Sequence, residues 1–394
     1  MQATPAPTFA AVLVASTLMA VVSGCGATVS GTPQRQETDV SRLDVGRYQV
    51  VPRALGVAVN DRQARIRESQ RLADYVALPS EADPALTQPP DSGLVIDHNG
   101  LDSILVNDTF EADTPGLRGG WVVTAQIPPA TGAAPPARTT SIAVVELPDD
   151  ARATAAGAAL EHDDFTFAPG NQPVRLPKYP QARAHWQPTV SSLGTWLTHG
   201  PYMVFVKIDA PGAPVPDLVD LTDRTQRAID VELPLLDRFR PAPADRFEHR
   251  ALDPDGLLGR TLRSTPRLAH QVPDGAYTGR GVIEQLDDPD LKALTVGDID
   301  RAAIGDTKVF HSRTAAASRA LWARWRPSAT HRHLLAPPRG IGGAIECFSD
   351  TQASEPDTDE CLFQVDLYTV RAKDTNREEL YQKVSAQYVL LTDR

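Results

Sequence analysis

The stretch YMVFVKIDAPGAPVPDLVDLTDRTQRAI, residues 202–229, contains the two patterns that decide the fold class. Its first part, Tyr202–Ile208, is rich in β-branched and aromatic residues, which is typical of a strand. In its second part, Asp217–Ile229, one helical stripe collects Leu218, Leu221, Thr225 and Ala228. A strand followed by an amphipathic helix indicates that sheet and helix belong to one packed unit.

The residues upstream extend this pattern. We predict that Thr195–Thr198 pairs with Tyr202–Ile208 as a hairpin that turns at His199–Pro201. Before the hairpin we expect two strands and an alanine-rich helix, at Trp121–Ile127, Ser141–Leu147 and Asp149–Glu161. Another helix, Asp61–Ala77, precedes them, and Pro79 ends it. The predicted order from Trp121 onward is strand, strand, helix, hairpin, helix.

The residues downstream repeat the same order. Two strands are expected at Val282–Leu286 and Thr307–His311, followed by a helix that Ser312 caps and that runs to Arg326. A second hairpin is expected from Gly343–Phe348 and Leu362–Val370. Thr375 would open the last helix, with Glu378 completing a capping box. Helices interleaved with antiparallel pairs predict an α+β fold of two similar units.

The chain of 394 residues is longer than one hydrophobic core usually serves. We expect a first unit at residues 60–240, with the N-terminal helix, and a second unit at residues 257–394. Residues 241–256, which carry Pro241, Pro243 and Pro254, are the expected linker.

The N-terminus resembles the export signal of a bacterial lipoprotein. Phe9–Val22 is uncharged, and its helix would rise roughly 21 Å, less than a hydrocarbon core of about 30 Å. Val22, Ser23, Gly24 and Cys25 resemble a lipobox. The resemblance implies that residues 1–24 are cleaved and that Cys25 carries acyl chains such as palmitate, which anchor the protein on the outer face of the cell membrane. Residues 25–59 would then be the lipidated cysteine and a flexible tether.

The alternative is that this apolar run is a buried segment of a cytosolic protein. The first eight residues, MQATPAPT, carry no Lys or Arg, although a signal peptide normally begins with positive charge. The formal net charge of -11 argues against binding to nucleic acid and to anionic lipid headgroups. A membrane location would therefore depend on the lipid at Cys25.

The two remaining cysteines are Cys347 and Cys361. An even number in an exported protein predicts a disulfide between them, worth about 3 kcal/mol for a loop of roughly fifteen residues. The alternative is two unpaired thiols.

Two stretches of the chain resemble a known family. DVSRLDVGRY at Asp39–Tyr48 and RESQRLADYVALPSEADPAL at Arg67–Leu86 are similar to actinobacterial cell-envelope lipoproteins, of mycobacterial and nocardial type, that contain a domain of unknown function. The resemblance implies an envelope location and a two-part fold. That family has no characterised activity, so it supplies no functional residues.

No cofactor is expected, and metal sites have only weak candidates. His331 and His333 would point the same way in an extended segment, as a pair of metal ligands requires. The acidic residues between the cysteines could supply oxygens to calcium, but they lack the spacing of a known loop: Asp350, Glu355, Asp357, Asp359 and Glu360. The plainer interpretation of both is a solvated loop.

The sequence contains no GxSxG, HExxH, SxxK or Walker motif. Our favoured hypothesis is therefore a non-catalytic lipoprotein that binds a small envelope ligand or a protein partner. One alternative is an envelope hydrolase with a dispersed active site, for which His199, His311 and His331 are the first candidates. Another is a structural or assembly factor of the envelope.

Overall fold

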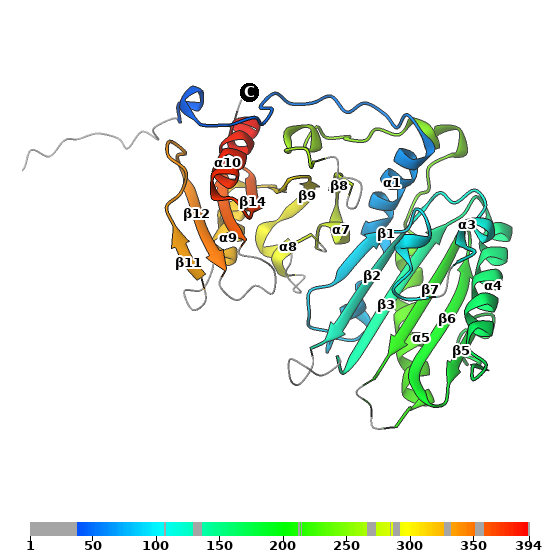
Figure 1. Ribbon diagram of the computed structural model, residues 1–394. Coiled ribbons are helices and arrows are strands. Elements are labelled where there is room, and N and C mark those ends of the chain that lie inside the picture. Colours follow the sequence, from blue (N-terminus) through cyan, green and yellow to red (C-terminus); the bar gives the residue numbers. More distant parts are fainter. Residues whose placement is uncertain are drawn as a thin grey trace, which may run out of the picture. The chain divides into compact units, whose positions relative to one another are not determined.

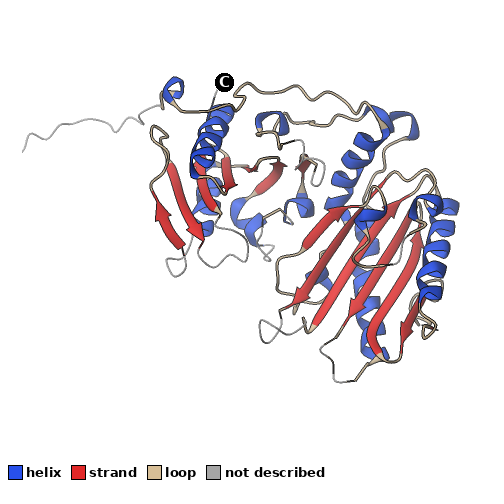
Figure 2. Cartoon of the chain, in the orientation of Figure 1, coloured by secondary structure: helices blue, strands red, loops and turns tan. Residues whose placement is uncertain are grey.

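The computed structural model describes residues 38–392, except 106–107, 129–135, 212, 214, 266–272, 284, 287–291, 327–331 and 351–357. Within these residues the chain forms two antiparallel sheets, each of seven strands, with helices packed on them (Figures 1 and 2). The fold is α+β, as predicted. No helix in this part of the chain is both long and apolar enough to cross a bilayer.

The first sheet has the strand order β1-β2-β3-β7-β6-β5-β4. Its strands are β1 (Asp91–Leu94), β2 (Gly119–Ile127), β3 (Arg138–Glu146), β4 (Gln172–Pro173), β5 (Arg183–Gln187), β6 (Val190–His199) and β7 (Tyr202–Asp209). Its helices are α1 (Asp61–Leu72), α2 (Pro79–Ala82), α3 (Phe110–Asp113), α4 (Asp150–Phe167) and α5 (Leu218–Leu236).

Helices cover both faces of this sheet. Met203 and Phe205 of β7 belong to the core cluster that contains α4 residues, whereas Val204 and Val206 belong to the cluster that contains α5 residues. Because alternate residues of a strand face opposite sides, both sets are buried only if both faces are covered. This explains why Tyr202–Ile208 is an almost continuous apolar run rather than an alternating one.

The second sheet has the strand order β11-β12-β13-β14-β10-β9-β8. Its strands are β8 (Gly275–Tyr277), β9 (Ile299–Ile304), β10 (Thr307–Ser312), β11 (Arg332–Leu335), β12 (Ala344–Asp350), β13 (Asp359–Val365) and β14 (Tyr368–Asp374). Its helices are α7 (Gly279–Ile283), α8 (Lys292–Gly297), α9 (Ala315–Trp325) and α10 (Arg377–Thr392). Short 3₁₀ turns include η2 (Ala73–Tyr75), η4 (Ala244–His249) and η5 (Leu258–Arg260).

The two units share one topology. In the first, the sheet order β2-β3-β7-β6-β5 comes with α4 after β3 and α5 after β7. In the second, the order β9-β10-β14-β13-β12 comes with α9 after β10 and α10 after β14. The predicted similarity of the halves is therefore confirmed, although each unit has four strands between its two helices where we had expected a two-stranded hairpin.

Several predicted elements were wrong in detail. Val282–Leu286 is not a strand, because Gly279–Ile283 forms the short helix α7. The stretch Leu362–Val370 is two strands, since Asp366 adopts a left-handed backbone conformation (φ 48°) in the tight turn between β13 and β14.

Helix caps also differ from the prediction. Thr314 rather than Ser312 caps α9, and its hydroxyl accepts a hydrogen bond from the Ala317 amide at 3.1 Å. Asn376 rather than Thr375 caps α10, where its side chain accepts from the amides of Glu378 and Glu379. The predicted capping box is therefore absent at this helix. The first helix ends at Leu72, and η2 follows it.

Cys347 and Cys361 form a disulfide bond. They are direct partners in the register of β12 and β13, their Cα atoms are 4.0 Å apart, and both side chains are fully buried. The bridge therefore joins the two neighbouring strands β12 and β13.

The segment that precedes the first unit packs on the second. The Tyr388 hydroxyl lies 3.1 Å from Thr38 Oγ1, the Gln382 amide donates to Asp44, and the Arg53 amide donates to Gly259 O at 3.0 Å. In Figure 1 this blue segment runs beside the red helix α10. Residues 25–59 were predicted to be a flexible tether. The part of this segment from Thr38 onward instead packs on the second unit.

Candidate anion-binding site

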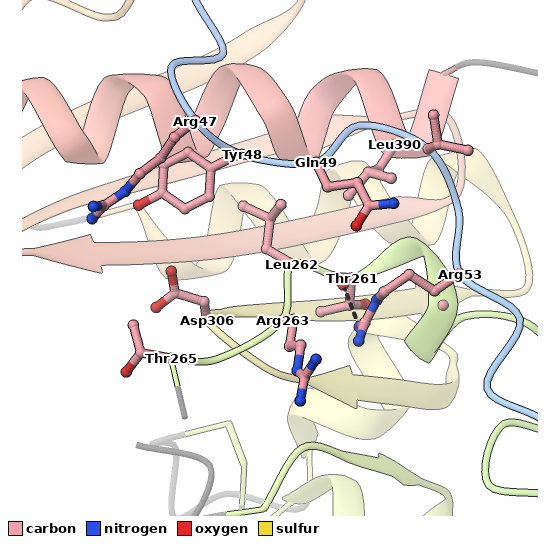
Figure 3. A pocket seen from close by; sticks show the side chains of 12 residues that line it. Arg47, Tyr48, Gln49, Arg53, Thr261, Leu262, Arg263, Thr265, Asp306 and Leu390 are labelled. Carbon is pink, nitrogen blue, oxygen red and sulfur yellow. Dashed lines mark hydrogen bonds between the residues drawn. The ribbon is translucent and has the colours of Figure 1, made fainter. Parts of the chain in front are cut away.

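A cavity of about 360 Å³ lies where this docked segment meets η5 and α10 (Figure 3). Residues 47–53 form one wall, residues 259–265 form another, and Asp306 and Leu390 complete the lining. The lining side chains that carry charge are Arg47, Arg53, Arg263 and Asp306. Three guanidinium groups against one carboxylate make the cavity cationic.

Arg53 and Arg263 come from different walls and repel each other. The Arg53 guanidinium donates to Leu258 O at 3.2 Å and to Thr261 O at 3.0 Å. Burial lowers the pKa of Arg53, and the nearby positive charge of Arg263 lowers it further, whereas Asp274 and Asp253 act in the opposite direction. Because Arg stays charged in proteins, two such groups held together favour an anion between them.

Arg263 is exposed, and it makes no ion pair with the residues that the structure describes. Arg47 is mostly exposed, with its guanidinium 3.5 Å from Glu379 Oε1. The Tyr48 hydroxyl donates to the other Glu379 oxygen at 3.1 Å. Of the three arginines that line the cavity, Arg263 is therefore the one whose guanidinium group is most available to a ligand.

Asp306, the acidic residue of the lining, contacts a buried lysine. Lys383, almost fully buried, places Nζ 3.1 Å from Asp306 Oδ1 and 2.9 Å from Asp374 Oδ2. Burial raises the pKa of Asp306, and Lys383 opposes this rise. Lys383 therefore offsets part of the charge of Asp306, while it is also paired with Asp374.

Gly259 allows the two walls to approach. A Cβ atom at this position would lie 2.2 Å from the carbonyl oxygen of Arg53. The side chain of Asp253 accepts hydrogen bonds from the amides of Leu258 and Gly259, which fixes the turn. The glycine therefore permits the close contact that positions Arg53.

Several residues predicted to be functional lie elsewhere. Cys25 and His331 fall outside the described residues. His333 is exposed on β11. Asp359 and Glu360 are not in an acidic loop, since they are buried in β13 and paired with Arg377 and Arg371. Within the described ranges, no group of three His, Cys, Asp or Glu side chains is arranged to hold a metal ion.

The other candidate histidines are separate from this cavity. His199 Nε2 lies 2.7 Å from Asp237 Oδ1 at the partly exposed end of β6. His311 Nδ1 lies 2.6 Å from Asp300 Oδ1, and its Nε2 lies 3.4 Å from the Arg301 guanidinium. The structure does not bring these two histidines to a shared site.

Sequence reasoning missed His185. This histidine is buried on β5, with Nδ1 3.3 Å from Glu161 and Nε2 3.0 Å from Asp164. It lines a second, smaller cleft of about 220 Å³. Because each ring nitrogen faces a carboxylate, neither is free to take a proton from a nucleophile. Little in the sequence pointed to this histidine, because the strand that carries it, β5, was itself not predicted.

Comparison with known families now places the chain. A model described as "Domain of unknown function (DUF7373) N-terminal" matches residues 55–252, and its C-terminal counterpart matches residues 257–394. The chain belongs to the DUF7373 family. The two matched ranges correspond to the two α+β units.

No curated protein matches the chain. Among solved structures, it is similar to the extracellular domain of PknH from Mycobacterium tuberculosis at 12% identity, with a TM-score of 0.31. The match covers 46% of this chain and 98% of that one. At this TM-score the similarity supports no conclusion about fold or function.

Proposed function

We propose that this member of the DUF7373 family is an actinobacterial extracytoplasmic lipoprotein that binds a small anionic envelope ligand without catalysing a reaction. Acyl chains on Cys25 would hold it on the outer face of the cell membrane. The observation that carries the binding role is the placement of Arg53 and Arg263, which lie close enough for their charges to interact, on two walls of one cavity.

The chemistry of the cavity suits an anion. Guanidinium groups present several N–H donors in a planar fork, which fits carboxylate and phosphate oxygens. The volume of about 360 Å³ lies at the lower end of the range of roughly 300–1,000 Å³ for small-molecule sites. A compact ligand with one or two anionic groups is therefore the best fit.

The location rests on the sequence. The lipobox-like residues before Cys25 support lipid attachment, and the stretch Asp39–Tyr48 supports the resemblance to envelope lipoproteins. That stretch also contributes Arg47 and Tyr48 to the cavity wall. The ligand site is thus built partly from residues that follow the anchor closely in the chain.

Calorimetric titration of the full-length protein with inorganic phosphate and with citrate tests the binding role. We expect binding that weakens with rising salt, since the attraction is electrostatic. Arg263→Gln should reduce the affinity about tenfold, corresponding to about 1.4 kcal/mol. Arg313→Gln is the matched control, because Arg313 is also exposed but does not line the cavity.

A separate experiment tests the proposed lipid attachment at Cys25. Mass spectrometry of the native protein should find an acylated Cys25 and no preceding peptide, and Cys25→Ser should release the protein from the membrane fraction. An intact N-terminus on cytosolic protein would contradict the location. Turnover of a cell-wall ester, amide or glycoside by the purified protein would contradict the non-catalytic role.

A further inference from the structure

We propose that the first unit contains a second ligand site, which binds a neutral saccharide ring in the cleft lined by His185. The cleft has a volume of about 220 Å³ and lies between the C-terminal end of α4 and strands β5, β6 and β7. It is built from residues of the first unit alone, and it shares none with the cationic cavity.

The rim of the cleft is apolar and exposed. Phe167, the last residue of α4, has 73% of its surface exposed, and Val190 at the start of β6 has 45% exposed. A single exposed apolar side chain is common on protein surfaces, but here two line one concavity. An aromatic ring at the rim offers a flat face on which the C–H face of a sugar can pack.

His185 and Phe205, which line the cleft, belong to a cluster of packed aromatic rings. The rings of His185 and Trp196 stack with centroids 5.1 Å apart, and Trp196 packs on Phe205 at 4.6 Å. Gly194 lies over this stack, because a Cβ atom there would come within 2.9 Å of the Trp196 ring. The absence of a side chain at position 194 therefore keeps the cleft open above the stack.

The charges around the cleft balance. Glu161 and Asp164 face His185, and Arg183 lies 3.8 Å from Glu161. Lys207, which also lines the cleft, is 3.8 Å from Asp209. Asp164 and Lys207, the acidic and basic side chains that line the cleft, carry opposite charges, so the cleft favours a neutral ligand.

The cleft also offers hydrogen bonds. The side chains of Gln187 and Ser192 line it and make no hydrogen bond with other described residues. A polar ring with hydroxyl groups can use an amide and a hydroxyl, whereas an acyl chain would leave them unpaired. The volume is below the range for drug-sized ligands, which fits one sugar ring.

Saturation-transfer NMR with full-length protein in a sugar-free zwitterionic detergent tests this proposal. The probes are maltose, mannobiose and diacetylchitobiose, with decanoate as the acyl competitor. We expect transfer to one face of a sugar ring. Phe167→Ala should weaken that binding about fivefold by removing the packing surface. Val219→Ala is the matched control, because Val219 is 72% exposed and lies outside the cleft.

Three results would overturn the saccharide site: no transfer to any of the sugars, equal transfer in Phe167→Ala, or displacement of the sugar by decanoate. Circular dichroism of Phe167→Ala verifies that the variant is folded. Arg263→Gln should leave sugar binding unchanged, so that failure of the anionic cavity and failure of this cleft give different results.

Discussion

Glu146 is buried beside Glu68 in the first unit, and burial, followed by the negative charge of Glu68, raises the pKa of Glu146 to about 8. Three arginines, Arg71, Arg118 and Arg250, lower it only in part. Glu68 accepts hydrogen bonds from Arg71 and from the Ala242 amide at 2.7 Å, whereas neither oxygen of Glu146 has a hydrogen-bond partner. Glu146 is therefore the acid of this pair whose protonated form burial favours.

This relationship predicts a pH dependence of stability. The folded protein binds a proton at Glu146 up to about pH 8, whereas the unfolded chain releases it near the ordinary value of 4.5. The free energy of unfolding should therefore fall as pH rises from about 5 to 8, by about 1.4 kcal/mol per unit of pKa difference at most. Glu146→Gln should flatten this fall, as measured by denaturant unfolding at pH 5 and pH 8. An equally steep fall in the variant would contradict the assignment.

Glu232 in α5 is a second buried acid with a raised pKa, and its contribution to stability can be tested in the same way. Burial raises its pKa to about 8, and its Oε2 accepts a hydrogen bond from the Ala77 amide at 2.7 Å. Glu232→Gln keeps an acceptor for Ala77, so it should preserve stability at pH 5 and increase it at pH 8. Glu232→Ala should destabilise the fold by about 2–4 kcal/mol at both values, because it leaves the amide unpaired and opens a cavity. Thermal unfolding of both variants separates these effects.

The arginines of the cationic cavity should affect stability in opposite ways. Arg263→Gln removes a repulsive charge from beside Arg53, so the free energy of unfolding should stay within about 0.5 kcal/mol of wild type or rise. Arg53→Gln loses two hydrogen bonds to backbone carbonyls and should cost about 1–3 kcal/mol. Urea denaturation measures both. Strong destabilisation by Arg263→Gln would mean that this residue has a structural partner instead of a ligand.

The disulfide should stabilise the second unit substantially. Cys347 and Cys361 are separated by 14 positions, so the chain-entropy model gives about 3 kcal/mol. The double variant Cys347→Ala/Cys361→Ala should lose about this amount in guanidinium unfolding. Wild-type protein unfolded with a reductant is the control and should approach the variant. No difference between oxidised and reduced protein would refute the expected contribution.

Local patterns predicted much of the fold. Hairpin strands such as Tyr202–Asp209 carry a dense apolar signal, and the even cysteine pair indicated the disulfide. The prediction failed at short elements. Val282–Leu286 has the composition of a strand, but an apolar run of five residues fits a buried helical turn equally well, and α7 is what forms.

The candidate sites could not be predicted in the same way. Arg53 and Arg263 are more than 200 positions apart, and neither carries a local motif. His185 lies in β5, a strand with little apolar signal, and its two carboxylates come from α4. Such groupings depend on contacts between distant segments, for which one sequence provides no periodic pattern.

The sequence by itself determined the α+β composition, the repetition of the two units and the cysteine pairing, because these follow from side-chain periodicity and counting along the chain. Only the tertiary structure decided which charges meet: Arg53 with Arg263, Glu68 with Glu146, and His185 with Asp164. The physical reason is that burial and charge proximity are properties of the packed chain. The same arginine or glutamate would be an ordinary solvated side chain if its segment were packed elsewhere.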